Sequence, residues 1–216
     1  MLIKPSLLRR AELIALSDIK LNGKVLDLGG VKNSSYISAF RGKFSVTIVN
    51  ISEMSSPDIF HDLESPLPIK SGEYNHVLLI NVLEHIFEYR SLLKEAERVL
   101  KTGGSAVIIV PFLFPLHPSP RDYHRFTERA LHEELVKAGF TDIVITPLGS
   151  GIFSAEYLLI DRLLPWPFRF LNYYTLRYVT SVLDTLVFFL ARVLGRGYTP
   201  EAYALGFCAV ARESGP

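Results

Sequence analysis

The chain has 216 residues, of which 49% are hydrophobic and 21% are charged, and its formal net charge is +1. This length and composition fit a single domain with a sizeable core. The near-neutral charge provides no basic field of the kind that nucleic-acid binding needs, so we expect no nucleic-acid partner. The single cysteine, Cys208, excludes an intrachain disulfide framework and a cysteine-rich zinc site. It lies in the apolar run "ALGFCAVA", which predicts a buried strand residue and is compatible with a reducing, cytoplasmic setting.

The first segment, residues 1–22, is predicted to contain an amphipathic helix. Apolar residues in "LLRRAELIAL" recur at helical spacing, and the charges among them interrupt the apolar stretch that a secretory signal would need. No later window supplies the roughly 18 uncharged apolar residues of a membrane span. The nearest candidate, around "TLVFFLA", is cut by Asp184 and Arg192. We therefore expect no membrane-spanning helix.

Residues 23–148 alternate between strand patterns and helix patterns. Six runs predict strands: "KVLDL", "FSVTIVN", "PDIFHDL", "YNHVLLIN", "SAVIIVP" and "FTDIVITPLG". Three runs predict helices: the short "SSYISAF", the amphipathic "YRSLLKEAERVL", and "ERALHEELVKAG", which Thr127 can cap and Gly139 can end. In "KTGG", Gly103 or Gly104 is suited to the left-handed residue that follows the second of these helices.

Residues 149–198 break this alternation, and residues 199–213 resume it. The former are rich in Leu, Phe, Tyr and Arg, and they predict two helices separated by the turn Pro165-Trp166-Pro167. The latter contain "EAYALGFCAVAR", the closing strand. The chain is thus predicted to be a single α/β domain over residues 1–216, with a mostly parallel seven-stranded sheet, helices on both faces and a helical insertion before the last strand. Ligands in such sheets bind beyond the carboxyl ends of the strands.

The stretch "KVLDLGGVKN" combines a buried strand with a glycine turn, but its spacing excludes two common nucleotide motifs. A dinucleotide fingerprint would need glycines at positions 29, 31 and 34, whereas the chain has Gly29, Val31 and Ser34. A phosphate-binding loop would need a Gly-Lys-Ser/Thr ending, which is missing here. A pyrophosphate requires bare backbone amides at close range, so this turn favours a cofactor without phosphates over NAD or ATP.

Four stretches in order carry a resemblance to a known family. They are "VLDLGG", "VNIS", "HDLESPLPIKSGEYNHVLLINVLEHI" and "AERVLKTGGSAVIIVP". Together they resemble the class I S-adenosylmethionine-dependent methyltransferases, especially the small enzymes of polysaccharide and lipid-glycan biosynthesis. The resemblance implies a Rossmann-like methyltransferase sandwich, a methyltransferase activity and S-adenosylmethionine as cofactor.

The resemblance also assigns residues to the parts of the cofactor. It places Asp27, Gly29 and Gly30 at the methionine part, Asn50 at the ribose, Asp62 and Leu63 at the adenine, and Asn81 near the sulfonium, and it adds Ile51 to the cofactor-binding residues. The family usually has an acid at position 50 and a glycine at position 31, so Asn50 and Val31 leave open a degenerate, non-catalytic relative. An amide has one accepting oxygen where a carboxylate has two, which weakens binding to a ribose diol.

The stretch "PFLFPLHPSPRDYHRFT", residues 111–127, follows the fifth strand and resembles a pattern of the glycan-associated branch. A hydroxyl acceptor must lose its proton as the new bond forms, and a histidine is the usual base. The candidate catalytic residues are therefore His117 and, second, His124. The candidate substrate-binding residues are Arg121, Asp122, Tyr123 and Arg125. The alternative is that Asp122 and Arg125 form a loop-stabilising ion pair and that Tyr123 and Phe126 are packing residues.

No metal site is predicted. Three possible ligands lie close together in the sequence: His117, Asp122 and His124. Some quinone O-methyltransferases bind a metal around their counterpart of "LEH", but with an acid where this chain has Asn81. We expect Glu84 to interact with the start of the following helix and His85 with nearby backbone.

Three functions remain open. The first is O-methylation of a sugar or lipid-linked glycan, the second is methylation of a quinone or other small molecule, and the third is a non-catalytic scaffold with the methyltransferase fold. The aromatic and arginine-rich residues 151–195 are typical of a lid, a homodimer contact or a peripheral contact with a membrane surface.

Overall fold

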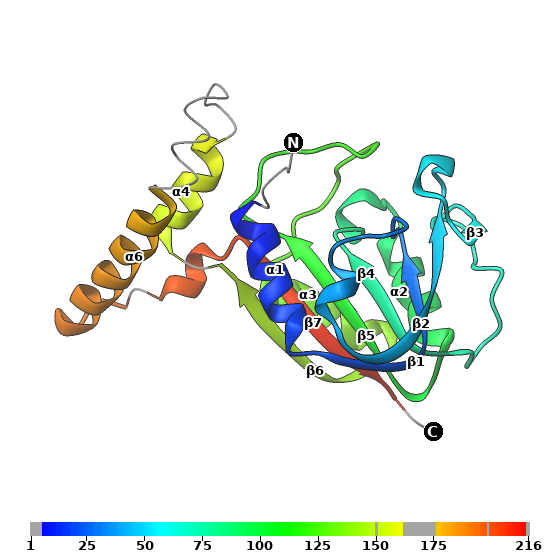
Figure 1. Ribbon diagram of the computed structural model, residues 1–216. Coiled ribbons are helices and arrows are strands. Elements are labelled where there is room, and N and C mark those ends of the chain that lie inside the picture. The colour runs from blue at the N-terminus through cyan, green and yellow to red at the C-terminus, as the bar shows by residue number, and fades with distance from the viewer. Residues whose placement is uncertain (1–5, 150, 162–175, 198, 215–216) are drawn as a thin grey trace.

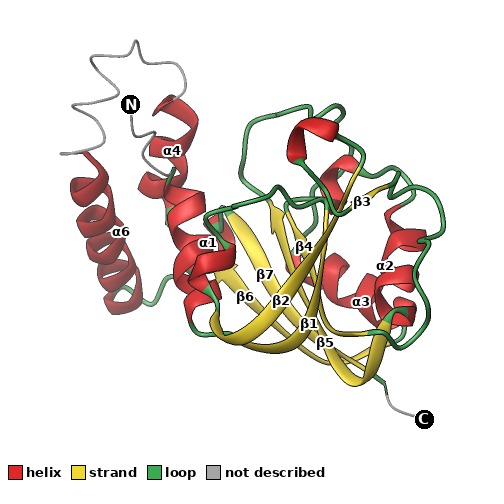
Figure 2. Cartoon of the chain, turned by 45° about the vertical axis from the view of Figure 1, so that its right-hand side comes forward, coloured by secondary structure: helices red, strands yellow, loops and turns green. Residues whose placement is uncertain are grey.

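The computed structural model describes residues 6–149, 151–161, 176–197 and 199–214, and these residues are built around one sheet (Figures 1 and 2). The strands are β1 (Lys20–Leu28), β2 (Arg41–Asn50), β3 (Ile59–Phe60), β4 (Tyr74–Ile80), β5 (Leu100–Pro111), β6 (Phe140–Leu148) and β7 (Gly206–Glu213). Their order in the sheet is β3-β2-β1-β4-β5-β7-β6. All neighbours are parallel except β7, which is antiparallel to both β5 and β6. The predicted mostly parallel seven-stranded sheet is confirmed.

Helices cover both faces of this sheet, as predicted. One face packs against α2 (Tyr89–Arg98) and α3 (Glu128–Ala138), and the other packs against α1 (Leu7–Ser17) and α4 (Ile152–Asp161). Helices on both faces leave the middle of the sheet buried. In β4, for example, the last four residues are all buried, in a run that is apolar on both faces. Each fully buried leucine contributes about 1.5–3 kcal/mol through its apolar area. Cys208 is also buried, in β7.

Three predicted boundaries were wrong. The N-terminal helix ends at Ser17 and β1 begins at Lys20, so residues 20–22 belong to the sheet, where Leu21 is fully buried. The "SSYISAF" run forms only a 3-10 turn, η1 (Ile37–Ala39), because its apolar residues are too few to give a helical stripe. The third strand is reduced to the two residues of β3.

The "KTGG" segment does not end a helix. Helix α2 ends at Arg98, and Leu100 already pairs with Tyr74 in the sheet. Gly103 has a positive φ of 73°, as predicted for one of the two glycines, but it lies inside β5 where the register with β4 shifts. A side chain at Gly104 would lie 3.0 Å from the carbonyl oxygen of Asn75, so the glycines permit this irregular pairing.

The insertion before β7 contains two helices, as predicted. Helix α4 packs against α6 (Leu176–Val193), and the pair projects from the body of the molecule (Figure 1). The predicted Pro-Trp-Pro turn at 165–167 lies outside the described residues. Asp184 of α6 is buried and joins the two helices, because it accepts hydrogen bonds from the backbone amides of Phe153 (2.8 Å) and Ser154 (3.0 Å) at the start of α4. None of the described helices is both long and apolar enough to span a bilayer.

Asp184→Ala should loosen the helix pair. The substitution leaves the first amides of α4 without their acceptor, so we expect the free energy of unfolding to fall by about 2 kcal/mol. Chemical denaturation and limited proteolysis of the insertion measure this effect. Thr185→Ala, on the exposed side of the same helix, is the matched control. Equal stability and equal protease resistance of the two variants would contradict the assigned role.

Candidate functional site

The carboxyl ends of β4 and β5 border a cavity of about 250 Å³. The strand ends contribute Asn81 and Pro111, the following loops contribute His85 and His117, and α1 closes the cavity with Arg9 and Glu12 among others. This is the edge at which ligands bind in open α/β sheets. The cavity therefore combines residues predicted for the cofactor with residues predicted for the acceptor.

Asp27, at the end of β1, lies beneath the glycine turn and not in the cavity. Its side chain is fully buried, and its Oδ2 accepts a hydrogen bond from the hydroxyl of Tyr36 at 2.7 Å. Burial raises the pKa of this carboxyl to about 7. A Cβ atom at Gly30 would lie 2.0 Å from the same carboxylate, so glycine is required there. Asp27 supports the turn from below, and its predicted contact with the cofactor stays a prediction.

Asn50, at the end of β2, holds the glycine turn from the side. Its amide nitrogen donates to the carbonyl oxygens of Gly29 (3.0 Å) and Gly30 (2.9 Å), and its Oδ1 accepts from the amide of Ser52 at 2.9 Å. A carboxylate could not make the two donor bonds. This explains physically why an amide is present here, whereas the predicted bond to a ribose diol is not tested by these contacts.

The residues predicted for the nucleoside differ in exposure. Ile51 is 54% exposed directly after β2, which is unusual for an isoleucine and leaves its side chain free to cover a ring. Asp62 is exposed, and its Oδ1 accepts from the amide of Glu64 at 3.0 Å. Leu63 is buried in the core beside these residues, with 8% exposure.

Asn81 connects β4 to the N-terminal helix. It has a positive φ of 55°, a conformation that costs energy in most residues and that asparagine tolerates better than others. Its amide nitrogen donates to Oε1 of Glu12 at 2.9 Å, and its own Oδ1 is buried without a hydrogen bond among the described residues. Such an unused acceptor fits the donor groups of a ligand.

Glu12 and Arg9 were not predicted as site residues. Glu12 is 1% exposed, its Oε2 lies 2.8 Å from Nη1 of Arg9, and burial raises its pKa. A sequence signal existed, because Glu12 is spaced four residues from both Leu8 and Leu16 and so interrupts the buried stripe of α1. A carboxylate on such a stripe is costly unless it is paired.

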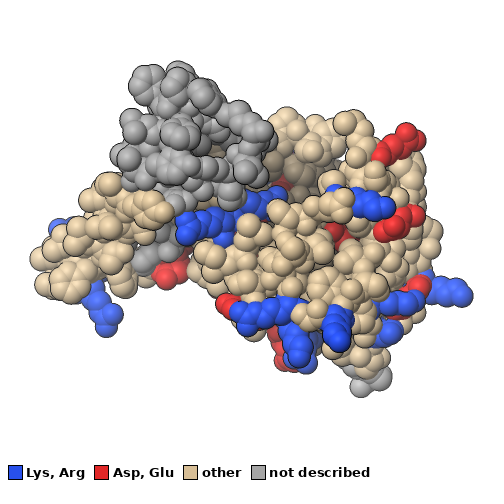
Figure 3. Space-filling model, in the orientation of Figure 1, with Lys and Arg blue, Asp and Glu red and all other residues tan. Residues whose placement is uncertain are grey.

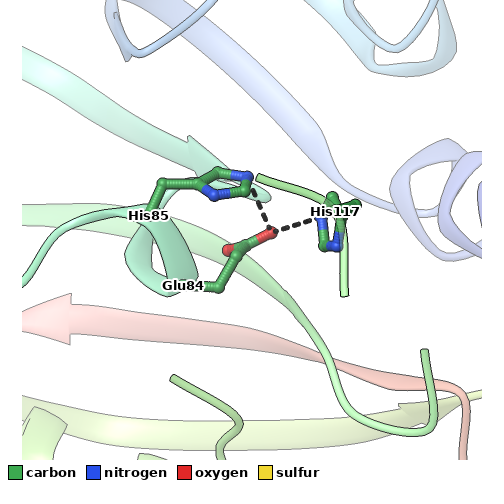
Figure 4. Close-up of side chains that lie close together, drawn as sticks. All are labelled: Glu84, His85 and His117. Carbon is green, nitrogen blue, oxygen red and sulfur yellow. Dashed lines mark ion pairs between the residues drawn. The ribbon is translucent and has the colours of Figure 1, made fainter. Parts of the chain in front are cut away.

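Glu84 is placed differently from the expectation. Its carboxylate is fully buried and points toward His85 and His117, with Oε1 3.7 Å from Nε2 of each ring (Figure 4). The predicted interaction with the start of the following helix was wrong, since neither carboxylate oxygen has a hydrogen bond. The nearby Glu84 carboxylate raises the pKa of His117 above its usual range.

The backbone of Glu84 also anchors the proline-rich loop. Its carbonyl oxygen accepts hydrogen bonds from the amides of Tyr123 (2.7 Å) and His124 (3.3 Å). Within this loop, Nη2 of Arg125 donates to Oδ2 of Asp122 at 2.7 Å, and the same Oδ2 accepts from the amide of His117 at 2.9 Å. Arg125 therefore holds the pKa of Asp122 well below its usual range. The ion pair of the alternative interpretation is present, and it fixes the loop at His117.

The other predicted loop residues lie apart from this cluster. His124 bonds through Nε2 to the carbonyl oxygen of Phe87 at 3.2 Å and packs on its ring. Arg121 is exposed and donates to the hydroxyl of Tyr123 at 2.9 Å. The structure thus joins Asp122 and Arg125 to His117, but it does not bring His124, Arg121 or Tyr123 to the wall of the cavity.

The three possible metal ligands considered from the sequence, His117, Asp122 and His124, do not form one cluster in the structure. Among the described residues, the group whose donor atoms could surround an ion is instead Glu84, His85 and His117, with these atoms all within 4.8 Å of one another. Sequence spacing could not show this, because His117 comes from a different loop, 32 positions after His85 (117 − 85 = 32).

Asn50→Asp should destabilise the protein, even though an acid is usual in the resembling family. The carboxylate would lose both bonds to the turn and would face two carbonyl oxygens, so we expect the free energy of unfolding to fall by about 1–2 kcal/mol. Chemical denaturation checks this, with Asn33→Asp in the neighbouring turn as the control. An Asn50→Asp protein of equal or greater stability would show that the amide bonds are not needed.

Comparisons with known proteins agree with the fold that carries this site. The profile of a family described as "Methyltransferase domain" matches residues 5–145. No curated protein sequence matches the chain significantly. Among solved structures, a Thermotoga maritima methyltransferase described as a possible histamine N-methyltransferase has 15% identity and a TM-score of 0.59, covering 97% of this chain and 90% of its own. An Archaeoglobus fulgidus S-adenosylmethionine-dependent methyltransferase has 16% identity and a TM-score of 0.57, covering 94% and 90%.

A third structure is Haemonchus contortus phosphoethanolamine N-methyltransferase 2, which contains S-adenosylhomocysteine. It has 16% identity and a TM-score of 0.57, and the match covers 96% of this chain and 52% of that one. At such identities these structures show a shared fold, whereas the family profile extends over most of the chain. The chain belongs to the methyltransferase domain family, and the predicted S-adenosylmethionine-dependent methyltransferase is confirmed at this level.

Proposed function

We propose that the protein transfers a methyl group from S-adenosylmethionine to a hydroxyl of a sugar or a lipid-linked glycan. The observation that carries this proposal is the cavity at the ends of β4 and β5, which Asn81 shares with His117. One residue belongs to the predicted cofactor side and the other to the predicted acceptor side. A methyl donor and a hydroxyl placed there would meet in one cavity.

The residues around the glycine turn fit the cofactor. Asn81 has a buried, unused acceptor oxygen, Ile51 exposes an apolar side chain, and Gly29 and Gly30 present backbone without side chains. When bound, S-adenosylmethionine supplies an electrophilic methyl group. In this assignment Asn81 and the glycine turn hold the methionine end, and Ile51 and Asp62 hold the nucleoside.

The lining of the cavity favours a polar acceptor. A site for a quinone or another aromatic molecule should be lined by Phe and Tyr, whereas this cavity includes Arg9, Glu12, His85 and His117, with Phe114 as an aromatic wall. His117 has its Nδ1 3.1 Å from the carbonyl oxygen of Pro115, which orients the ring and leaves Nε2 to take the proton of the hydroxyl. The buried carboxylate of Glu84 then stabilises the imidazolium.

His117→Ala should lower the turnover number at saturating cofactor at least tenfold, because the proton acceptor is lost. Mass spectrometry of glycan and lipid extracts incubated with protein and cofactor would identify the acceptor by a gain of one methyl group, and that acceptor is then used for the kinetics. His132→Ala, at a half-buried histidine of α3 that does not line this cavity, is the control. A fall of less than tenfold would overturn the role of His117, and calorimetry without cofactor binding would favour the non-catalytic scaffold.

The outer face of α6 supports an acceptor carried by a lipid. Apolar side chains that are 44% to 71% exposed lie along the helix pair. On α6 and the residues that follow it, they form a stripe at helical spacing: Tyr178, Val179, Val182, Leu186, Phe189, Leu190, Val193 and Leu194. The outer surface of this pair contains few charges in the view of Figure 3. The exposed Arg192 and Arg196 lie at the end of the stripe, while the acid of α6, Asp184, is buried.

This combination of an apolar stripe with arginines fits the surface of an anionic membrane. We therefore propose a peripheral contact, with α6 lying along the lipid surface. A homodimer contact through the same stripe is the competing outcome.

The double substitution Leu186→Ser and Phe189→Ser should abolish co-sedimentation with phosphatidylglycerol vesicles. It removes apolar area that would be buried among the lipid chains. Phosphatidylcholine vesicles should bind the unmodified protein more weakly, since they lack charge. The matched control is Val136→Ser with Val144→Ser, two exposed apolar positions away from α6. A dimer in solution that the Leu186 and Phe189 substitutions dissociate, without vesicle binding, would overturn the membrane contact.

A further inference from the structure

Three atoms that carry lone pairs converge beside the cavity. Oε1 of Glu84 lies 3.7 Å from Nε2 of His85 and 3.7 Å from Nε2 of His117, and the three donor atoms are all within 4.8 Å of one another (Figure 4). Glu84 comes from the turn η3 (Leu83–His85) after β4, and His117 comes from the loop after β5. Two separate segments therefore meet at this point.

The other nitrogen of each ring is already used. Nδ1 of His85 lies 2.5 Å from the carbonyl oxygen of Arg121, and Nδ1 of His117 lies 3.1 Å from the carbonyl oxygen of Pro115. A carbonyl oxygen only accepts hydrogen bonds, so each Nδ1 carries the hydrogen and each neutral ring has its lone pair on Nε2. Histidines that bind metals show this same arrangement, in which the second nitrogen donates to a carbonyl or carboxylate.

The carboxylate of Glu84 makes the arrangement unfavourable without a cation. The side chain is 0% exposed, and neither of its oxygens has a hydrogen-bond partner. A buried, unpaired carboxylate that faces two lone pairs is strongly disfavoured. A positive charge between the three atoms removes this cost.

We propose that Glu84, His85 and His117 bind a divalent transition-metal ion. Two imidazole nitrogens and one carboxylate oxygen suit Zn²⁺, Mn²⁺, Fe²⁺ or Co²⁺. Metal–ligand bonds of about 2.0–2.2 Å place neighbouring ligands roughly 3–3.6 Å apart, so the two 3.7 Å separations from Glu84 need a small contraction, and the histidine nitrogens, within 4.8 Å of each other, would have to approach as well. His85 and His117 both line the cavity, so an ion bound by them would lie beside it.

The proposed ligand set does not include Asn81. Asn81 binds Glu12 and contributes no charge, and His117 supplies the third ligand from the proline-rich loop. The ion pair between Asp122 and Arg125 fixes that loop, since Asp122 accepts from the amide of His117. The sequence-based expectation of no metal is therefore replaced by this proposal.

Metal binding deepens the proposed function and, as to acceptor placement, rests on it. Nε2 of His117 holds either a metal ion or a proton, so a bound ion would replace the imidazole as base: it would hold the acceptor hydroxyl and acidify it, and the proton would pass to solvent. The site itself does not depend on methyl transfer. It can be tested on the protein alone.

The experiment uses the full chain, purified without a histidine tag and treated with a chelator. Co²⁺ is added while its ligand-field absorption is followed, and Zn²⁺ and Mn²⁺ are titrated by calorimetry. We expect one equivalent of Co²⁺ or Zn²⁺ to bind with nitrogen and oxygen ligation. Glu84→Gln, His85→Ala and His117→Ala should each weaken binding at least tenfold, and the control His132→Ala, at a half-buried histidine outside the cluster, should bind like the unmodified protein. Circular dichroism confirms that each variant is folded, and Glu84→Gln preserves the shape of the side chain.

Two results would overturn the proposal. One is the absence of stoichiometric binding for all three ions. The other is binding that survives in the folded Glu84→Gln and His117→Ala proteins or is lost equally in His132→Ala, which would indicate adventitious surface binding. If no ion binds while the protein still binds S-adenosylmethionine and methylates an acceptor, the metal site fails and the proposed function stands. Loss of cofactor binding with intact metal binding would give the opposite result.

Discussion

The buried carboxylate of Glu84 is the constraint on which the acceptor side of the molecule depends. Its backbone carbonyl oxygen accepts hydrogen bonds from two amides of the proline-rich loop. Its side chain faces His85 and His117 without a hydrogen bond. One residue thus fixes where the loop runs and also places a buried carboxylate beside two imidazoles. Because an unpaired buried charge costs far more than a surface one, the loop cannot drift from this position without exposing or neutralising the carboxylate.

Polar side chains at the other strand ends bind neighbouring backbone and side-chain groups. Asp27 supports the glycine turn from below, Asn50 binds it from the side, and Glu12 ties Asn81 to the N-terminal helix. These contacts keep bare backbone at the edge of the sheet in one conformation before any ligand arrives. A ligand then loses less free energy in ordering its site, which is the general advantage of a preorganised pocket.

The fold could be predicted from sequence because each core strand is a short apolar run, and β4 is apolar on both faces. The loop that follows β5 was predicted to bind the acceptor because charged residues and histidines crowd within it. Pairings between distant segments were not predictable: periodicity describes one segment at a time, whereas His117 meets Glu84 through the tertiary fold alone. The role of "KTGG" was misassigned for a related reason, since a left-handed glycine fits both a helix end and an irregular strand pairing.

Helix α1 links the two halves of the site. Its buried stripe carries Glu12 into the cavity, while Arg9 lies one turn earlier, beside the ring of Tyr36, whose hydroxyl binds Asp27. A chain of contacts thus runs from the glycine turn, through this helix, to the end of β4. The helix is the only described element that touches both Asn81 and the tyrosine above Asp27 through charged side chains. Arg9 makes both the ion pair with Glu12 and the contact with the ring of Tyr36, so one side chain of the helix connects the two strand ends.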